Sequence, residues 1–255
     1  MASNDQDLFA PAYGREQLLG NASPRMAFDP DADFWAWRGR VDSKLRELLG
    51  SLPAKVPLDL KVDYERETEL CRELWFVFSS EPHVDVPCHL LIPREGEEPF
   101  PAVICLQGHT TGMHLSLGRP KCVGDAESIA QDDDFALQAV RQGYAALAME
   151  QRWFGERKDS RTSDYTLGCH HATMTALLLG RTTIGERVWD VMRAVVARHV
   201  ANQELTVEAA LTGNRSLALQ ALVNDPLLRE LESAEPMLDE MLEANRRHLP
   251  KFFRD

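Results

Sequence analysis

The sequence predicts an α/β fold in which an antiparallel β-meander leads into parallel strands, followed by a helical C-terminal segment. Two observations carry this prediction. Residues 102–106 and 144–149 are short apolar runs bounded by turn residues and separated by a helical pattern, which is typical of buried parallel strands. Upstream of them, three strand-like runs follow one another with no helical pattern between them, which favours a meander.

The length and charge of the chain bound its class. It has 255 residues and a formal net charge of −12. Nucleic acid or an anionic membrane surface would require clustered Lys and Arg, so this acidic balance argues against both partners. The N-terminus lacks a basic and then apolar leader, and no apolar stretch reaches the roughly 18 residues that span a bilayer. We therefore expect a cytoplasmic protein whose five cysteines are free thiols.

The N-terminal part predicts a surface arm over residues 1–33 and then a helix over 34–49. Apolar residues recur at helical spacing in that helix, and Asp31 or Asp33 can cap its start. Phe34, Trp35 and Trp37 form an aromatic cluster. Packing against the sheet explains this cluster better than a substrate wall does.

The predicted strands cover residues 58–64, 74–78 and 86–92, followed by the central strand 102–106. A Gly- and Thr-rich turn comes directly after the central strand, at the end where open α/β sheets place their chemistry. Irregular chain continues to about residue 131. Asp132, Asp133 and Asp134 then fit the start of the next helix by capping, and a metal site is the less favoured interpretation.

Helices are expected over residues 170–179 and from Thr183 to about His199, the second opening with a capping box from Thr183 to Glu186. From about residue 200 the strand-like runs cease, and four further helical patterns follow, the first over 206–211. The expected domains are the arm 1–33, an α/β domain 34–199 and a helical segment 200–255.

Five motifs spread over about 160 residues resemble the α/β-hydrolase family, in particular its dienelactone-hydrolase and acetyl-esterase-like branch. The motifs are CLQGHT at 105–110, GYAALAME at 143–150, RWFGER at 152–157, CHH at 169–171 and GRTTIGERVWD at 180–190. The resemblance implies carboxylic-ester hydrolysis of acetylated sugars or other small esters. It also implies that Gly108, His109 and Thr110 contribute to an oxyanion hole. Residues 34–196 carry the match.

The sequence departs from this family at its nucleophile. No G-x-S-x-G occurs anywhere, so the Ser, acid and His of the usual triad have no assignment. Residues of about 200–250 instead resemble the helical tail of glycoside hydrolase family 4, through VANQELTVEAALTG at 200–213, LALQAL at 217–222 and MLEAN at 241–245. Family 4 enzymes depend on NAD and a metal, but their Gly-rich loop and their Cys and His ligands lie upstream of this tail, and no G-x-G-x-x-G follows a strand here. We therefore expect no cofactor and no metal for this chain. The chain therefore looks chimeric. Natural gene fusion, engineering and an error in assembling the sequence would all give this pattern.

Several other residues could carry chemistry or could have simple structural roles. The substrate-pocket candidates are Glu150, Arg152, Trp153 and His170. Arg152 and Arg157 can bind an anionic substrate, or can pair with Glu150 or Glu156. As alternative nucleophiles we considered Ser116, Cys122 and Cys169, and as a metal set the histidines 109, 114, 170 and 171. A loop hydroxyl, ordinary thiols and no metal are the favoured interpretations.

The resulting prediction is a protein of ester-hydrolase lineage whose activity is in doubt. The alternatives are a non-catalytic remnant, or a module that a partner chain completes, and a glycosidase-related function implied by the tail. If the chain is active, its partner is a small-molecule ester. We also expect the sheet edge after the strand 144–149 to be open, which favours a homo-oligomer.

Overall fold

The computed structural model describes residues 11–97, 100–158 and 165–207, and the chain divides into two compact units, Met1–Leu49 and Gly50–Asp255. In the first unit, helix α1 covers Pro11–Gly20 and α2 covers Phe34–Leu49. Asp33 caps α2 as predicted, because its carboxylate accepts the N–H groups of Trp35 (2.8 Å) and Ala36 (3.1 Å). Helix α1 lies within the segment that the sequence predicts as a surface arm.

The aromatic cluster of the first unit packs on itself. The ring of Trp37 lies 4.9 Å from that of Phe28, and its indole N–H donates to the Met26 carbonyl at 3.0 Å. Phe34 meets the same Phe28 ring edge-on at 6.0 Å. These contacts give the cluster a local structural role.

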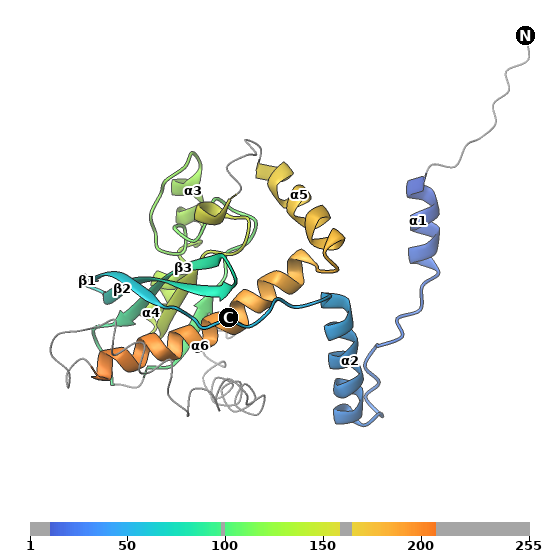
Figure 1. Ribbon diagram of the computed structural model, residues 1–255, viewed down its shortest axis with the longest axis horizontal. Helices are drawn as coiled ribbons and strands as arrows, with labels where there is room; N and C mark the ends of the chain where they lie inside the picture. Colours follow the sequence, from blue (N-terminus) through green and yellow to red (C-terminus); the bar gives the residue numbers. More distant parts are fainter. Residues whose placement is uncertain (1–10, 98–99, 159–164, 208–255) are drawn as a thin grey trace, which may run out of the picture. The chain divides into compact units, whose positions relative to one another are not determined.

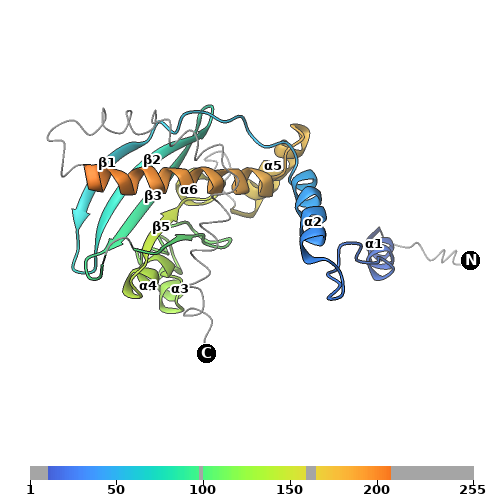
Figure 2. The same cartoon turned by 90° about the horizontal axis from the view of Figure 1, so that it is seen from below.

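The second unit is built on a five-stranded sheet of order β1-β2-β3-β5-β4 (Figures 1 and 2). The strands are β1 Lys61–Glu67, β2 Cys71–Glu81, β3 Val84–Pro93, β4 Ala102–Cys105 and β5 Ala145–Met149. Strands β1, β2 and β3 pair antiparallel, and β4 and β5 pair parallel, so the predicted fold class is confirmed.

The two faces of the sheet are covered by different helices (Figure 2). Helix α6, Thr183–Val207, places Ala194 and Ala197 against the larger apolar core on one face. Helix α4, Phe135–Arg141, places Ala136, Ala139 and Val140 against the other. Strand β5 is Ala-rich and buried along its whole length, because α6 covers one face of the sheet and α4 covers the other.

The position of β5 corrects the predicted sheet edge. Strand β5 pairs with β3 on one side and β4 on the other, so it is internal. The edge strand on this side of the sheet is β4, in which Ala102, Val103 and Ile104 are only partly buried. Strand order along the sequence would place β5 at the sheet edge, beyond β4. The crossover through α4 instead places β5 between β3 and β4.

The helices also differ in extent from the prediction. A short helix α3, Asp125–Ala130, lies in the stretch expected to be irregular. Helix α5 covers Tyr165–Leu178, and α6 continues to Val207 as one helix, so no separate helix opens at 206. The cap of α6 is Thr182, whose hydroxyl accepts the Gly185 N–H at 2.9 Å, and not Thr183. The predicted helices beyond residue 207 lie outside the described residues.

Candidate functional site

The Gly- and Thr-rich turn leaves the carboxyl end of β4, as the sequence predicts. Gly108 and His109 are exposed, whereas Gln107 and Gly112 on either side are buried. The Thr110 N–H donates to the Gly108 carbonyl at 2.9 Å, so this N–H is used within the turn. We therefore take the Gly108 N–H, and not the Thr110 N–H, as the oxyanion ligand to test, and the His109 N–H stays a prediction.

The buried carboxylate of Glu150, directly after β5, holds both flanks of this turn. It accepts the Gln107 side-chain amide at 2.7 Å, the Met113 N–H at 3.2 Å and the Glu156 N–H at 3.3 Å. Burial raises the pKa of the Glu150 carboxyl, and the backbone N–H bonds offset only part of this rise. Glu150 therefore fixes the start and the end of the turn to the loop after β5.

Two glycines make room for the Glu150 carboxylate. A Cβ on Gly155 would overlap it, lying only 2.6 Å from its Cδ. A Cβ on Gly112 would lie 2.9 Å from the Gly155 Cα and 3.0 Å from a Glu150 carboxylate oxygen. The G-H-T-T-G segment, 108–112, and the R-W-F-G segment, 152–155, thus approach each other closely only because Gly112 and Gly155 lack a side chain.

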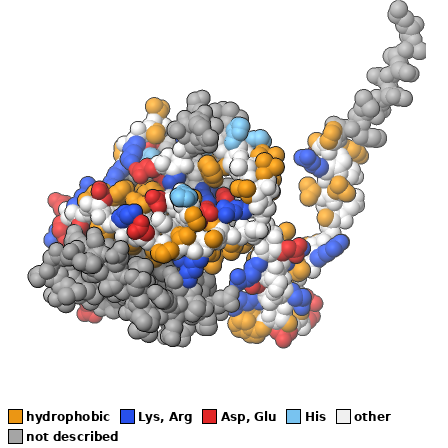
Figure 3. Space-filling view, in the orientation of Figure 1, with side chains coloured by type: hydrophobic (Ala, Val, Ile, Leu, Met, Phe, Trp, Pro, Cys, Tyr) orange, Lys and Arg blue, Asp and Glu red, His pale blue; other side chains and the backbone are white. Residues whose placement is uncertain are grey.

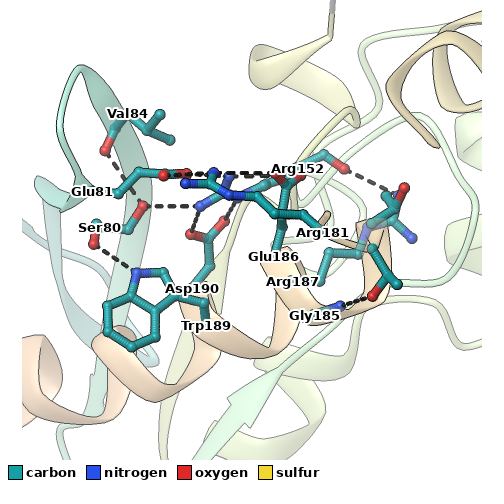
Figure 4. Close-up of polar contacts among 12 residues, drawn as sticks. Ser80, Glu81, Val84, Arg152, Arg181, Gly185, Glu186, Arg187, Trp189 and Asp190 are labelled. Carbon is teal, nitrogen blue, oxygen red and sulfur yellow. Dashed lines mark hydrogen bonds and ion pairs between the residues drawn. The ribbon is translucent and has the colours of Figure 1, made fainter. Parts of the chain in front are cut away.

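Arg152 lies two residues after Glu150, and its side chain enters a buried network of ion pairs (Figure 4). Its guanidinium donates to both oxygens of Asp190 at 2.7 Å and to Glu81 at 2.5 Å. Arg157 also donates to Asp190 at 2.7 Å, and Arg181 joins Glu81 to Glu186. Burial alone would raise the pKa of Asp190, but the hydrogen bonds and charges of Arg152 and Arg157 outweigh it and lower that pKa.

This network corrects the predicted partners of the two arginines. Neither Arg152 nor Arg157 pairs with the carboxylate of Glu150 or Glu156. They meet on Asp190 of α6 instead, and so connect the loop after β5 to that helix. Because the Arg152 guanidinium is buried and satisfied, it is a structural residue and not an open anion site.

A second polar cluster surrounds Asp125 at the start of α3. Its carboxylate accepts the Thr111 hydroxyl at 2.6 Å, and it lies 2.8 Å from Nε2 of His114. It also accepts the N–H groups of Lys121 and Cys122. These hydrogen bonds outweigh burial, which would raise the pKa of Asp125, and lower it. The cluster fixes the loop that follows the turn.

The same cluster contains donor types that could hold a metal ion. One ligand atom each of His114, Cys122 and Asp125 lies within 4.8 Å of the others. The Asp125 oxygens are already occupied by four donors, and Cys122 is exposed. Hydrogen bonding therefore explains the arrangement, and we assign no metal to it. The histidine set predicted as a metal alternative is not brought together here.

The remaining candidates occupy different positions. Trp153 has a left-handed backbone, with φ of 69°, and its indole N–H is buried with no acceptor among the described residues. His170 is exposed, and its ring meets that of His171 at 6.0 Å. Ser116 is fully buried. Its hydroxyl has no hydrogen-bond partner among the described residues, so no base adjoins it, and its carbonyl anchors α4 by accepting the Ala136 and Leu137 N–H groups.

One contact unites two segments that the sequence analysis kept apart. Sγ of Cys169, on α5, lies 3.3 Å from Nε2 of His109 in the turn. The His109 ring also packs edge-on against Phe154 at 5.2 Å. Adjacency of Cys169 and His170 in sequence concealed this pairing, because the relevant imidazole is 60 residues away.

A separate cavity of about 280 Å³ lies on the meander, lined among others by Tyr64, Trp75 and His89. It reaches the loop after the turn through Met113 and His114. The face in Figure 3 shows acidic and basic side chains interspersed with apolar ones. None of the described helices combines the length and apolar character that a bilayer crossing requires.

This mixed sheet, with a turn after β4 buttressed from the end of β5, is the framework of an α/β hydrolase. A model of the Abhydrolase family matches residues 2–205, and the chain belongs to that family. A solved Bacteroides fragilis structure, described as a "putative acetyl xylan esterase", superposes with a TM-score of 0.59 at 23% identity. That comparison covers 76% of this chain and 51% of the other, and it supports the fold.

Two kinds of curated relatives match the chain. "Putative hydrolase YtaP" of Bacillus subtilis is 25% identical over 161 residues, which are 62% of this chain and 50% of YtaP. An "Alpha-galacturonidase" of Lachnoclostridium phytofermentans is 39% identical over 70 residues, 26% of this chain and 15% of that protein. The chain thus spans half or less of these relatives, and the resemblance to both families is confirmed.

Proposed function

We propose that this chain hydrolyses small carboxylic esters, acetylated sugars among them, with the Gly108 turn as the oxyanion-binding half of the site. The observation that carries the proposal is the Glu150 carboxylate, which holds the turn through Gln107 and Met113. A donor can stabilise a developing oxyanion only if it is fixed before the reaction. The three hydrogen bonds to Glu150, together with the close packing that Gly112 and Gly155 allow, hold the turn in place.

The experiment is turnover of 4-nitrophenyl acetate by the full chain and by two variants of one residue. Gly108→Pro removes the N–H, and we expect it to lower kcat about 10²-fold or more, the usual effect of losing one oxyanion donor. Gly108→Ala keeps the N–H, and its Cβ would meet nothing within 4 Å, so its loss should be much smaller. Absence of turnover in a folded sample, or equal loss in both variants, would reject the proposal.

A second candidate function is a module completed by another chain, which the open edge of β4 favours. No described strand pairs with the outer side of β4, and three of its four residues are partly exposed. Light scattering after size exclusion should then show a dimer. Val103→Lys, which places a charge on this edge strand, should shift it toward monomer. A monomer at all concentrations would contradict this candidate.

A further inference from the structure

A thiol and an imidazole meet beside the proposed oxyanion donor. Sγ of Cys169 lies 3.3 Å from Nε2 of His109, within the hydrogen-bond distance that nucleophile and base require. His109 is exposed and Cys169 is partly exposed, so a small molecule can reach both groups. His109 also belongs to the turn itself, directly after Gly108.

Arg187, which pairs with no carboxylate of the described residues and donates through Nη2 to the Arg152 carbonyl at 3.1 Å, adjoins this pair. Nη2 of Arg187 lies 3.9 Å from the Cys169 Sγ, and its guanidinium carbon lies 4.2 Å above the Phe154 ring centre. Among the described residues Arg187 forms no ion pair, and its Nε is buried with no acceptor, whereas Arg152, Arg157 and Arg181 are all paired with carboxylates. A half-buried cation of this kind favours an anion beside it, either a thiolate or an acyl oxyanion.

We propose that Cys169 is the nucleophile of the ester hydrolysis proposed above, with His109 as its base and Arg187 as the cation that stabilises the thiolate. The inference rests on that function and supplies the group that its usual serine motif does not. Carboxylic esters are the substrate class, because the partly exposed thiol lies beside the turn that carries the proposed oxyanion donor.

The proposed reaction proceeds through a thioester. His109 accepts the thiol proton, and Sγ attacks the carbonyl carbon, forming the C–S bond while the carbonyl π electrons move to oxygen. Collapse of this intermediate breaks the C–O bond, and His109 returns the proton to the leaving alcohol. Water then attacks the thioester with His109 again as base, which releases the carboxylic acid and restores the thiol.

Cys122 provides a matched comparison within the same chain. It is an exposed thiol, and an imidazole lies nearby, that of His114. Nε2 of His114, however, lies 2.8 Å from the Asp125 carboxylate and 3.2 Å from the Thr111 hydroxyl. This imidazole is therefore committed to structural hydrogen bonds, and we expect Cys122 to be an ordinary thiol.

The first test is acid-quenched mass spectrometry after mixing the full chain with 4-nitrophenyl acetate. We expect one acetyl group on Cys169, none after Cys169→Ala, and an unchanged yield after Cys122→Ala. Acetylation that persists in Cys169→Ala would overturn the inference. Turnover that persists there with a fluorophosphonate-labelled serine would overturn it too, yet leave the proposed ester hydrolysis intact. Absence of turnover and acylation in the folded wild type would reject both.

The second test measures the rate of alkylation by iodoacetamide as a function of pH, which requires no ester. At neutral pH Cys169 should react at least 10-fold faster than Cys122, because a cation and a base favour its thiolate. His109→Gln and Arg187→Gln should each remove most of this advantage, whereas Arg187→Lys should retain part of it. Equal rates for the two thiols in the wild type would contradict the activation of Cys169. Circular dichroism checks the fold of each variant.

Discussion

Glu150 and Arg152 follow β5 two residues apart, and their buried side chains are satisfied by different kinds of partners. Glu150 is surrounded by dipoles, from an amide side chain and backbone N–H groups, and burial raises its pKa. Arg152 is surrounded by charges, and its partner Asp190 has a lowered pKa. The hydrogen bonds to Glu150 hold the turn without placing a positively charged side chain beside it. The ion pairs of Arg152, in contrast, hold α6 against the sheet.

The comparison predicts that removing Arg152 costs the most stability. Arg152→Met leaves the buried carboxylates of Asp190 and Glu81 with fewer partners, and breaking a buried pair in this way costs about 3–5 kcal/mol. Urea unfolding measures this loss.

An exposed ion pair supplies the control for Arg152→Met. Lys44→Ala, which breaks the exposed pair with Glu47 on α2, should change stability by no more than about 0.5 kcal/mol. A loss below about 1 kcal/mol in Arg152→Met would show that the network is not a main fastening of α6.

The second prediction concerns the room around Glu150. A Cβ at Gly155 overlaps a carboxylate that is held by three hydrogen bonds, and the backbone there has a φ of 42°. We expect Gly155→Ala to cost about 3 kcal/mol through overpacking and backbone strain. The control is Gly143→Ala, where φ is 81° but nothing lies within 4 Å, so strain alone should cost about 1 kcal/mol. Equal costs in thermal or urea unfolding would show that the Glu150 carboxylate moves aside easily.

The third prediction separates the two carboxyls by their pH dependence. The folded state lowers the pKa of Asp190 from its ordinary value of 3.8, so its contribution is present above pH 3.8 and is lost as pH falls. The folded state raises the pKa of Glu150 from 4.5, so its contribution is present below pH 4.5 and is lost as pH rises.

Stability measured by urea unfolding between pH 2.5 and 7 tests these signs. The difference between wild type and Asp190→Asn should shrink as pH falls below 3.8. The difference between wild type and Glu150→Gln should shrink as pH rises above 4.5. Parallel curves for the two variants would contradict the contrast between charges and dipoles.

The sequence predicted the sheet and the turn because both follow local rules. Apolar runs and turn residues identify β4 and β5, and the family motifs identify Gly108. The partners of Arg152 and the pairing of Cys169 with His109 could not be predicted, because these contacts join residues 38 and 60 positions apart. The edge position of β4 was missed for a related reason, since sequence order does not give strand order.

The smallest expected effect comes from a single dipole at Glu150. Gln107→Met removes the side-chain amide that donates at 2.7 Å, but the Met113 and Glu156 N–H groups continue to bind the carboxylate. We therefore expect a loss of only about 1 kcal/mol in urea unfolding, the net contribution of one hydrogen bond. Because Gln107 also begins the turn, Gly108 should lose its fixed position. The loss in kcat for the ester, expressed as a free energy of activation, should then exceed the loss in the free energy of unfolding. Equal losses would mean that the Gln107 amide serves the fold alone.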